Sequence, residues 1–179
     1  MNIGKIQESV LKRSVFRQLK TKRKEVLSGA EPGEDCAILS FPPDEELLVS
    51  SSAAVKTGHD AVLYGIHTAV NNIAACGGRP AAIWLTVLLP PEAEEENLKA
   101  LMKQADQICA GMDIQIAGGH TEVTSAVKRT AVSATAAGTV SPGQGIRTSG
   151  LYPGAELVVT KWIGLEGTAV AAREKEQEL

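Results

Sequence analysis

Two adjacent glycines followed by an ionisable side chain form the stretch best suited to chemistry, Gly118-Gly119-His120-Thr121-Glu122. The glycines come directly after an expected strand over 113–117. They allow the backbone to turn tightly and to approach a ligand closely. Consecutive backbone N–H groups in such a turn can bind an anion. The spacing matches neither the P-loop nor the dinucleotide-binding fingerprint. The motif therefore predicts a backbone turn beside a ligand, without identifying that ligand.

Three further stretches carry polar groups that suit a metal ion or a phosphate. Gly33-Glu34-Asp35 lies at an expected turn, where its carboxylates could hold Mg²⁺ or could simply be solvated. Asn71-Asn72 falls within an expected helix, although asparagine is a poor helix former. This pair is either a buried hydrogen-bonding centre or a ligand contact. Lys161, between an expected strand and an expected helix, could meet a phosphate at the helix N-terminus, or the stretch could only cap that helix.

The elements that must position these stretches alternate between helical and strand-like periodicity. Helices are expected over 3–19, 60–76, 91–110 and 165–178, and strands over 36–41, 47–51, 81–89, 113–117, 129–140 and 156–160. Adjacent strands with interspersed helices predict an α+β fold, with a mixed or antiparallel sheet flanked by helices. The last expected helix runs to the end of the sequence. We therefore expect one domain, 1–179, that is truncated before a C-terminal domain.

Composition excludes several classes of protein. The 179 residues are 44% hydrophobic and 22% charged, which is typical of a globular domain. Aromatic residues make up only 3%, which argues against base-stacking platforms for nucleic acid. No apolar run is long enough to predict a signal peptide or a membrane span. Cys36, Cys76 and Cys109 form no CxxC pair, which argues against a zinc site and favours reduced thiols in a cytoplasmic protein.

The charge is unevenly distributed along the chain. Residues 1–27 carry eight basic and two acidic side chains, a balance of +6, whereas the whole chain has a net charge of −3 and the remainder therefore −9. This basic segment is either a solvated helix face or a surface that meets phosphates, nucleic acid or an acidic partner.

Four motifs, taken together and in order, resemble one family. They are GEDCAIL (33–39), VNNIAACGGRP (70–80), AGGHTEVT (117–124) and TKWIGLEGTAVAA (160–172). The chain resembles, over nearly all of residues 3–175, the amino-terminal domain of the PurM-like (AIR synthase) superfamily. Within it the chain is most similar to HypE-like hydrogenase-maturation and AIR synthase-related proteins. The resemblance implies ATP bound near a dimer cleft, Mg²⁺ held by carboxylates, and a sheet that pairs across a homodimer.

The resemblance also implies which residues form the site. Asp35 and His120 would contact the metal ion. The nucleotide would be contacted by Asn71, Asn72, Gly118, Gly119, His120, Thr121 and Lys161. Ser52, Asn72 and His120 occupy positions where many members carry carboxylates, and neutral donors bind Mg²⁺ less strongly. The chain therefore keeps the glycine and asparagine pattern of these motifs but lacks part of the negative charge that would hold the metal ion.

The function implied by the resemblance is that of the ATP-binding domain of an enzyme that activates an amide or carbonyl oxygen by phosphorylation. Hydrogenase maturation, with a maturation-partner protein, is the expected context, and this fragment alone is expected to be inactive. No catalytic residue is assigned. One alternative is a non-catalytic dimerisation or scaffold domain with a degenerate nucleotide site. Another is phosphotransfer similar to that of selenophosphate synthetase or thiamin-monophosphate kinase.

Overall fold

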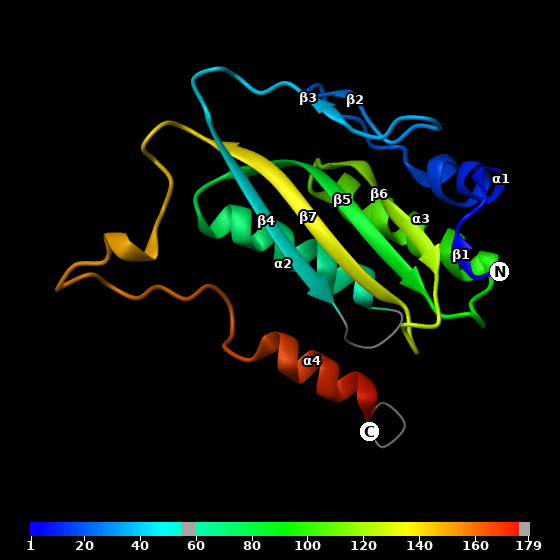
Figure 1. Cartoon of the computed structure of the whole chain (residues 1–179). Coiled ribbons are helices and arrows are strands. Elements are labelled where there is room, and N and C mark those ends of the chain that lie inside the picture. Colours follow the sequence, from blue (N-terminus) through cyan, green and yellow to red (C-terminus); the bar gives the residue numbers. More distant parts are fainter. Residues whose placement is uncertain (55–59, 176–179) are drawn as a thin grey trace. The chain divides into compact units, whose positions relative to one another are not determined.

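A five-stranded mixed sheet forms the centre of the fold, in the order β1-β6-β5-β7-β4 (Figure 1). The strands are β1 (Gly4–Lys5), β4 (Glu46–Ala54), β5 (Arg79–Leu89), β6 (Gln115–Val123) and β7 (Ala131–Val140). Strands β5 and β6 are parallel, and all other neighbours are antiparallel. This confirms the predicted α+β class with a mixed sheet.

The structure is a computed structural model that describes residues 1–54 and 60–175. It comprises two units, Met1–Ile146 and Arg147–Leu179, which are described separately. The sheet and the two long helices belong to the first unit.

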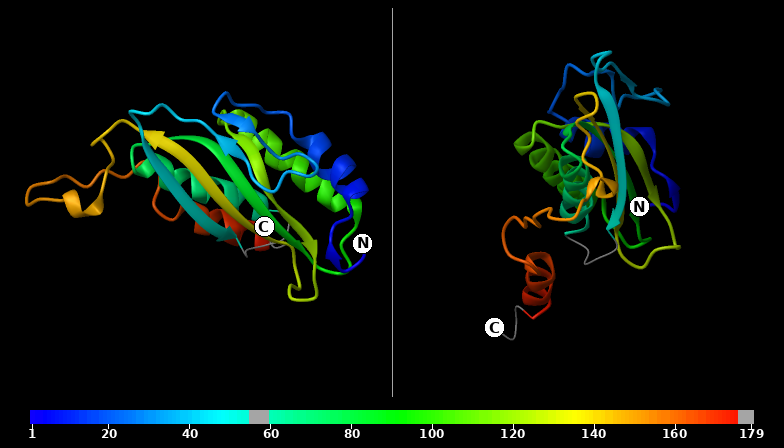
Figure 2. Two further views of the ribbon diagram at one scale, coloured as in Figure 1. Left: turned by 45° about the horizontal axis from the view of Figure 1, so that its top comes forward. Right: turned by 90° about the vertical axis from the view of Figure 1, so that its left-hand side faces the viewer.

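Helices α2 (Ala61–Ala75) and α3 (Glu95–Gly111) lie on one face of the sheet (Figure 2). Their buried stripes include Ile66 and Ile73 of α2 and Leu98 of α3. Alternate residues of β5 and β7 meet them, because side chains of a strand point to opposite faces in turn. The core consists almost entirely of Ala, Val, Ile and Leu, as the scarcity of aromatic residues predicts.

The opposite face of the sheet is not covered by these helices. Along β4 burial alternates, with Leu48 close to α2 while Leu47 and Val49 point away from it and are 58% and 63% exposed. On the same face, the hydroxyl groups of Ser51 and Thr135 form a 2.9 Å hydrogen bond between β4 and β7. We refer to this surface as the open face of the sheet.

The first segment is helical, but it is not the single helix that its periodicity predicts. It passes from α1 (Glu8–Val10) through a π-helical turn, η1 (Leu11–Val15), to a 3₁₀ turn, η2 (Phe16–Gln18). The Phe16 N–H bonds to the Leu11 carbonyl, which is the i→i+5 bond of a π-helix. Several of its basic side chains are neutralised within the protein, since Lys12 pairs with Glu8 and Arg13 with Glu95.

Glu95 attaches this segment to the start of α3. Its carboxylate accepts hydrogen bonds from Arg13 Nε at 2.5 Å, Arg13 Nη2 at 2.6 Å and Ser14 Oγ at 2.6 Å. The bonds from Arg13 have the largest effect and the bond from Ser14 the next largest. Together they lower the pKa of Glu95 from 4.5 to about 2. A carboxylate with a lowered pKa favours the folded state above its ordinary pKa, and the contribution is lost as the pH falls towards the folded-state value.

We therefore expect the melting temperature of the protein to decrease as the pH is lowered from 4.5 to about 2, partly because Glu95 becomes protonated. Differential scanning calorimetry across this range would measure it. Glu95→Gln should lower the midpoint at neutral pH and flatten its acid dependence. The control is Glu92→Gln, because the carboxylate of Glu92 lies shortly before α3 and receives no such bonds from the described residues. An unchanged acid profile in Glu95→Gln would contradict the assignment.

Two smaller regions differ from the sequence-based expectation. The strand expected over 36–41 is reduced to β3 (Ile38–Leu39), which pairs with β2 (Val26–Ser28) in a separate two-stranded sheet. The second unit contains a short 3₁₀ turn, η3 (Thr148–Gly150), and α4 (Leu165–Glu174). The prediction of a strand over 156–160 is wrong. No strand among the described residues lies beside this segment to accept and donate its backbone hydrogen bonds. None of the described helices has the length and apolar character needed to cross a bilayer.

Candidate functional site

The glycine motif lies inside strand β6, and the predicted turn is therefore wrong. Ile83 of β5 aligns with Ile116, whereas the next residue, Trp84, aligns with Gly118. One extra residue, Ala117, thus enters β6 as a β-bulge, a device that redirects the side chains that follow it. Strict alternation from the buried Ile116 would turn His120 towards the helices. The bulge instead places His120 on the open face.

The two glycines are required by the close approach of β5. A Cβ added to Gly118 would lie 2.6 Å from Trp84 Cδ1, so the indole occupies the space of a side chain at 118. A Cβ added to Gly119 would overlap the Leu85 carbonyl oxygen and lie 2.8 Å from the Leu85 carbonyl carbon. Gly119 also has a φ of 148°, which L side chains rarely adopt. The two glycines thus allow β6 to lie close to β5 and leave room for the Trp84 indole.

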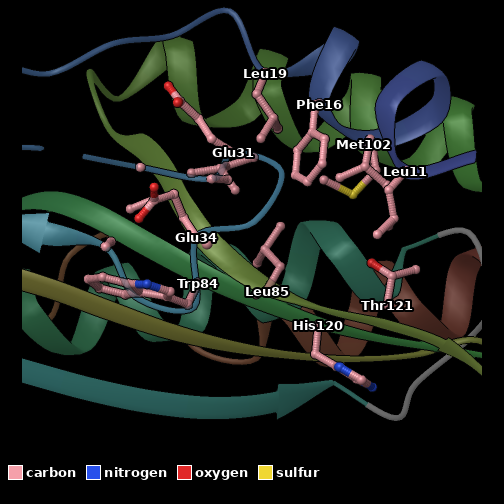
Figure 3. Close-up of a pocket in the computed structure, with 18 of the residues that line it drawn as sticks. Leu11, Phe16, Leu19, Glu31, Glu34, Trp84, Leu85, Met102, His120 and Thr121 are labelled. Carbon is pink, nitrogen blue, oxygen red and sulfur yellow. The ribbon is translucent and has the colours of Figure 1, made fainter. Parts of the chain in front are cut away.

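A cavity of about 500 Å³ lies against this part of β6, and we call it the β6 cavity (Figure 3). Its volume is within the range of small-molecule sites. One wall is apolar and comes mainly from the first helical segment and α3; it contains Leu11, Val15, Phe16, Leu19 and Met102. The other walls comprise Gly118–Thr121, Trp84, Lys5 and the segment 29–37.

The β6 cavity is electronegative on the side of the 29–37 segment. Glu31, Glu34 and Asp35 all line it, and none of them forms an ion pair within residues 1–54 and 60–175. Lys5 is the only lysine or arginine among the described residues of the wall. Such a wall favours a ligand that presents hydrogen-bond donors or brings a cation with it.

His120 is held by a neighbour on its own strand. Its Nε2 lies 3.0 Å from Glu122 Oε2, since residues two apart on a strand share a face. His120 is exposed and Glu122 is half-buried. His120 lines the cavity with one ring nitrogen already bonded, and no hydrogen bond to Nδ1 comes from the described residues, so Nδ1 can meet a ligand.

The structure brings some of the predicted site residues together and separates others. Asp35, Gly118, Gly119, His120 and Thr121 share the wall of the β6 cavity. Within the described residues, no group of three or more His, Cys, Asp or Glu side chains is arranged to hold a metal ion.

The remaining predicted residues lie outside this wall. Asn72 Nδ2 donates to Ser50 Oγ at 2.9 Å, so Asn72 joins α2 to β4. Asn71 is exposed, and neither asparagine lines the cavity. Lys161 belongs to the second unit, where it is exposed and has a φ of 63°.

Several cavity residues carried no signal in the sequence. Trp84 lies in an apolar run that is typical of an ordinary buried strand, and Phe16 lies within the helix expected over 3–19, where nothing marks it as part of a site. One signal pointed to the bulge: glycine within a strand often marks a bulge or a close backbone approach.

Comparison with known proteins identifies the family. The profile of "AIR synthase related protein, N-terminal domain" matches residues 33–140, which is more than half of the chain and includes β4, β5, β6 and β7. The chain belongs to the AIR synthase related family. This confirms the resemblance to PurM-like proteins.

Curated relatives include members with different activities. The chain is 24% identical over 171 residues to a putative hydrogenase expression/formation protein of Methanocaldococcus jannaschii, covering 93% of this chain and 51% of that protein. It is 29% identical over 164 residues to thiamine-monophosphate kinase of Salmonella typhimurium, covering 86% of this chain and 46% of the kinase. The chain therefore spans about half the length of these relatives.

A solved structure shares the fold. The hydrogenase maturation protein HypE in complex with ATP superimposes with a TM-score of 0.63 at 16% identity, over 74% of this chain and 39% of HypE. At this identity the likeness concerns the fold of this AIR synthase related domain.

Proposed function

We propose that this AIR synthase related domain binds ATP in the β6 cavity, as part of an enzyme that activates an oxygen atom of its substrate by phosphorylation. The observation that carries the proposal is the convergence of Asp35 and the Gly118–Thr121 strand on one cavity of nucleotide-compatible volume. HypE is a protein of this fold described in complex with ATP, and a thiamine-monophosphate kinase is among the curated relatives. Both support ATP as the shared ligand.

Mg²⁺ fits this cavity only together with the nucleotide. The described residues offer no preformed cluster of three ligands, but Mg²⁺ is commonly held by one or two carboxylates, phosphate oxygens and waters. Asp35, the family carboxylate that this chain retains, would supply one such oxygen. A cation between Asp35 and the phosphates would also offset the repulsion between the acidic wall and a triphosphate.

We expect Mg²⁺-ATP to bind and Asp35→Asn to weaken its binding about ten- to hundredfold, because a charged hydrogen-bonding or metal-bonding group contributes about 1.5–3 kcal/mol. Isothermal titration calorimetry with and without EDTA would measure both effects. Asp44→Asn removes an exposed carboxylate outside the cavity wall and is the matched control. If the unaltered chain gives no binding heat with about millimolar Mg²⁺-ATP, the scaffold alternative is favoured instead.

The likeness to the hydrogenase expression/formation protein supports hydrogenase maturation as the context, with a maturation protein as partner. We attribute to this chain only the nucleotide-binding part of that activity. The three cysteines are free, which is compatible with a reducing compartment such as the cytoplasm. A thiamine-phosphate type of phosphotransfer is the second candidate, supported by the kinase relative.

We further propose that two copies pair through the open face of the sheet. Leu47 and Val49 are exposed apolar side chains on β4, which lies at an edge of the sheet. Apolar side chains that lie together on an exposed surface mark a site where another chain packs. The open face is thus the surface of the first unit that we expect a second copy to cover.

A further inference from the structure

Three exposed lysines occupy alternate positions in the segment that joins η2 to β2. They are Lys20, Lys22 and Lys24, and none of them forms an ion pair within residues 1–54 and 60–175. Four residues of chain span at most about 14 Å, so the first and last of these lysines start from backbone positions no further apart than that. Unpaired positive charges this close together attract negative groups. We call this group the lysine row.

Buried polar side chains hold the backbone of the lysine row in place. The carboxylate of Asp106 on α3 is 8% exposed and accepts the N–H groups of Lys20 at 2.9 Å and Thr21 at 3.2 Å. Gln115 on β6 is 3% exposed and accepts the Arg23 N–H at 2.7 Å. Because these bonds already fix the backbone, a partner can bind the row without ordering the segment first.

The arginine within this segment is already neutralised. Arg23 Nε and Nη2 donate to the Glu25 carboxylate at 2.9 Å and 3.0 Å, and Nη1 donates to the Asp113 carbonyl oxygen at 2.8 Å. Arg23 also forms an ion pair with the Asp113 carboxylate. These two carboxylates are therefore engaged by Arg23, and the lysines keep their charge available for a second molecule.

A second cavity, of about 980 Å³, is bordered by the last lysine of the row. Its lining includes Leu27, which is 66% exposed, and the half-buried side chains of Phe41 and Met112. An apolar surface with charged residues at its rim is the usual arrangement of a protein–protein interface. We call this the β2 cavity, and it shares no lining residue with the β6 cavity.

We propose that the lysine row and the β2 cavity together dock a segment of a partner protein that carries several carboxylates and a large apolar side chain. Each exposed pair of a lysine and a carboxylate raises an affinity only about 1.4- to 5-fold, so three pairs contribute about 3- to 150-fold. Burial of a side chain such as phenylalanine adds about 10- to 150-fold. Neither contribution alone reaches the roughly thousandfold that a millimolar Kd requires, so the site needs both.

An acidic protein segment suits this surface better than a nucleic acid does. Sites for single-stranded nucleic acid combine basic groups with aromatic rings on which bases stack, and residues 20–24 include no aromatic side chain. Arginine, which binds phosphate in a bidentate manner, is represented here only by Arg23, which is engaged by Glu25. The net charge of −3 also opposes the approach of a long polyanion.

Fluorescence anisotropy with a labelled peptide tests the docking. The probe is Phe-Thr-Glu-Thr-Glu-Thr-Glu-Thr-Phe, whose carboxylates alternate as the lysines do and whose two ends allow either direction. We expect it to bind at about 0.01 M salt and more weakly at about 0.1 M salt. Replacement of both phenylalanines by alanine should weaken binding about 10- to 150-fold. Equal binding of the alanine peptide, or no binding of the probe at about millimolar concentration, would overturn the inference.

A variant of the protein tests the lysine row. Replacement of its three lysines by glutamine should weaken binding of the probe about 3- to 150-fold. The matched control has the same net charge, because it replaces three exposed lysines elsewhere in the first unit by glutamine: Lys99, Lys103 and Lys128. The control should bind the probe as the unaltered chain does, and the melting temperature of each variant checks the fold. Equal weakening in both variants would reduce the effect to net charge and overturn the inference.

Two further ligands separate this inference from other proposals. If an oligothymidine of about 12 nucleotides binds more tightly than the probe and loses affinity in the lysine-row variant, the surface is a nucleic-acid site and the inference is wrong. Mg²⁺-ATP should bind the lysine-row variant and the unaltered chain equally, since the two cavities share no lining residue. The inference and the proposed function therefore stand or fall separately.

Discussion

Gly119→Ala is expected to lower the free energy of unfolding by about 3–4 kcal/mol, a large part of the stability of a typical domain. The new methyl group would overlap the carbonyl group of Leu85 on β5, and these atoms belong to the backbone of the central strand. A side chain could rotate away, but a strand that is paired on both sides cannot shift without breaking its hydrogen bonds. The φ of 148° adds strain for any residue with a Cβ.

Urea denaturation would measure this change as a shift in midpoint at constant slope. Gly118→Ala should cost less, because its methyl group meets the side chain of Trp84, which can move. Gly111→Ala is the control, since an added Cβ at this end of α3 would meet no described atom within 4 Å apart from its own stretch of helix. A helical alanine there should be neutral or stabilising by up to about 1 kcal/mol. If Gly119→Ala unfolds at the same urea concentration as Gly111→Ala, the close approach of the strands is not what requires glycine.

The sequence predicts the elements of the first unit well where periodicity is strong. The apolar stripes of α2 and α3 and the apolar run of β5 match the observed elements to within a few residues. It fails where long-range pairing decides the outcome. Residues 156–160 have the composition of a strand, but a strand also needs a neighbour, and the described residues provide none.

The site could be predicted only in part, for a related reason. The residue types of the glycine motif indicate that the backbone there approaches another group closely. The structure shows that this group is the neighbouring strand β5. Local spacing cannot reveal that Ala117 is an extra residue relative to β5, yet this bulge decides which face His120 occupies. Nor can it reveal that Trp84 borders the same cavity as Glu34, because that proximity depends on how the 29–37 segment folds over the sheet.

Val49→Lys is expected to separate the proposed homodimer without destabilising the monomer. Val49 is 63% exposed in the single chain, so a lysine there can remain solvated and the free energy of unfolding should change little. In a dimer that pairs through the open face, the same lysine would be a buried charge without a partner. Such a charge costs about 3–5 kcal/mol, which corresponds to a loss of affinity of at least about a hundredfold.

Sedimentation velocity over a range of protein concentrations would measure the dimer. The matched control is Leu27→Lys, which alters an equally exposed apolar side chain on β2, in the separate two-stranded sheet. We expect Leu27→Lys to remain dimeric and Val49→Lys to sediment as a monomer. A dimer that survives in Val49→Lys would mean that the copies pair elsewhere, and an unaltered chain that is monomeric at every concentration would refute the pairing. Because His120 lies on the open face, separation of the dimer should also change the surroundings of the cavity beside His120, so nucleotide affinity measured on Val49→Lys links the two proposals.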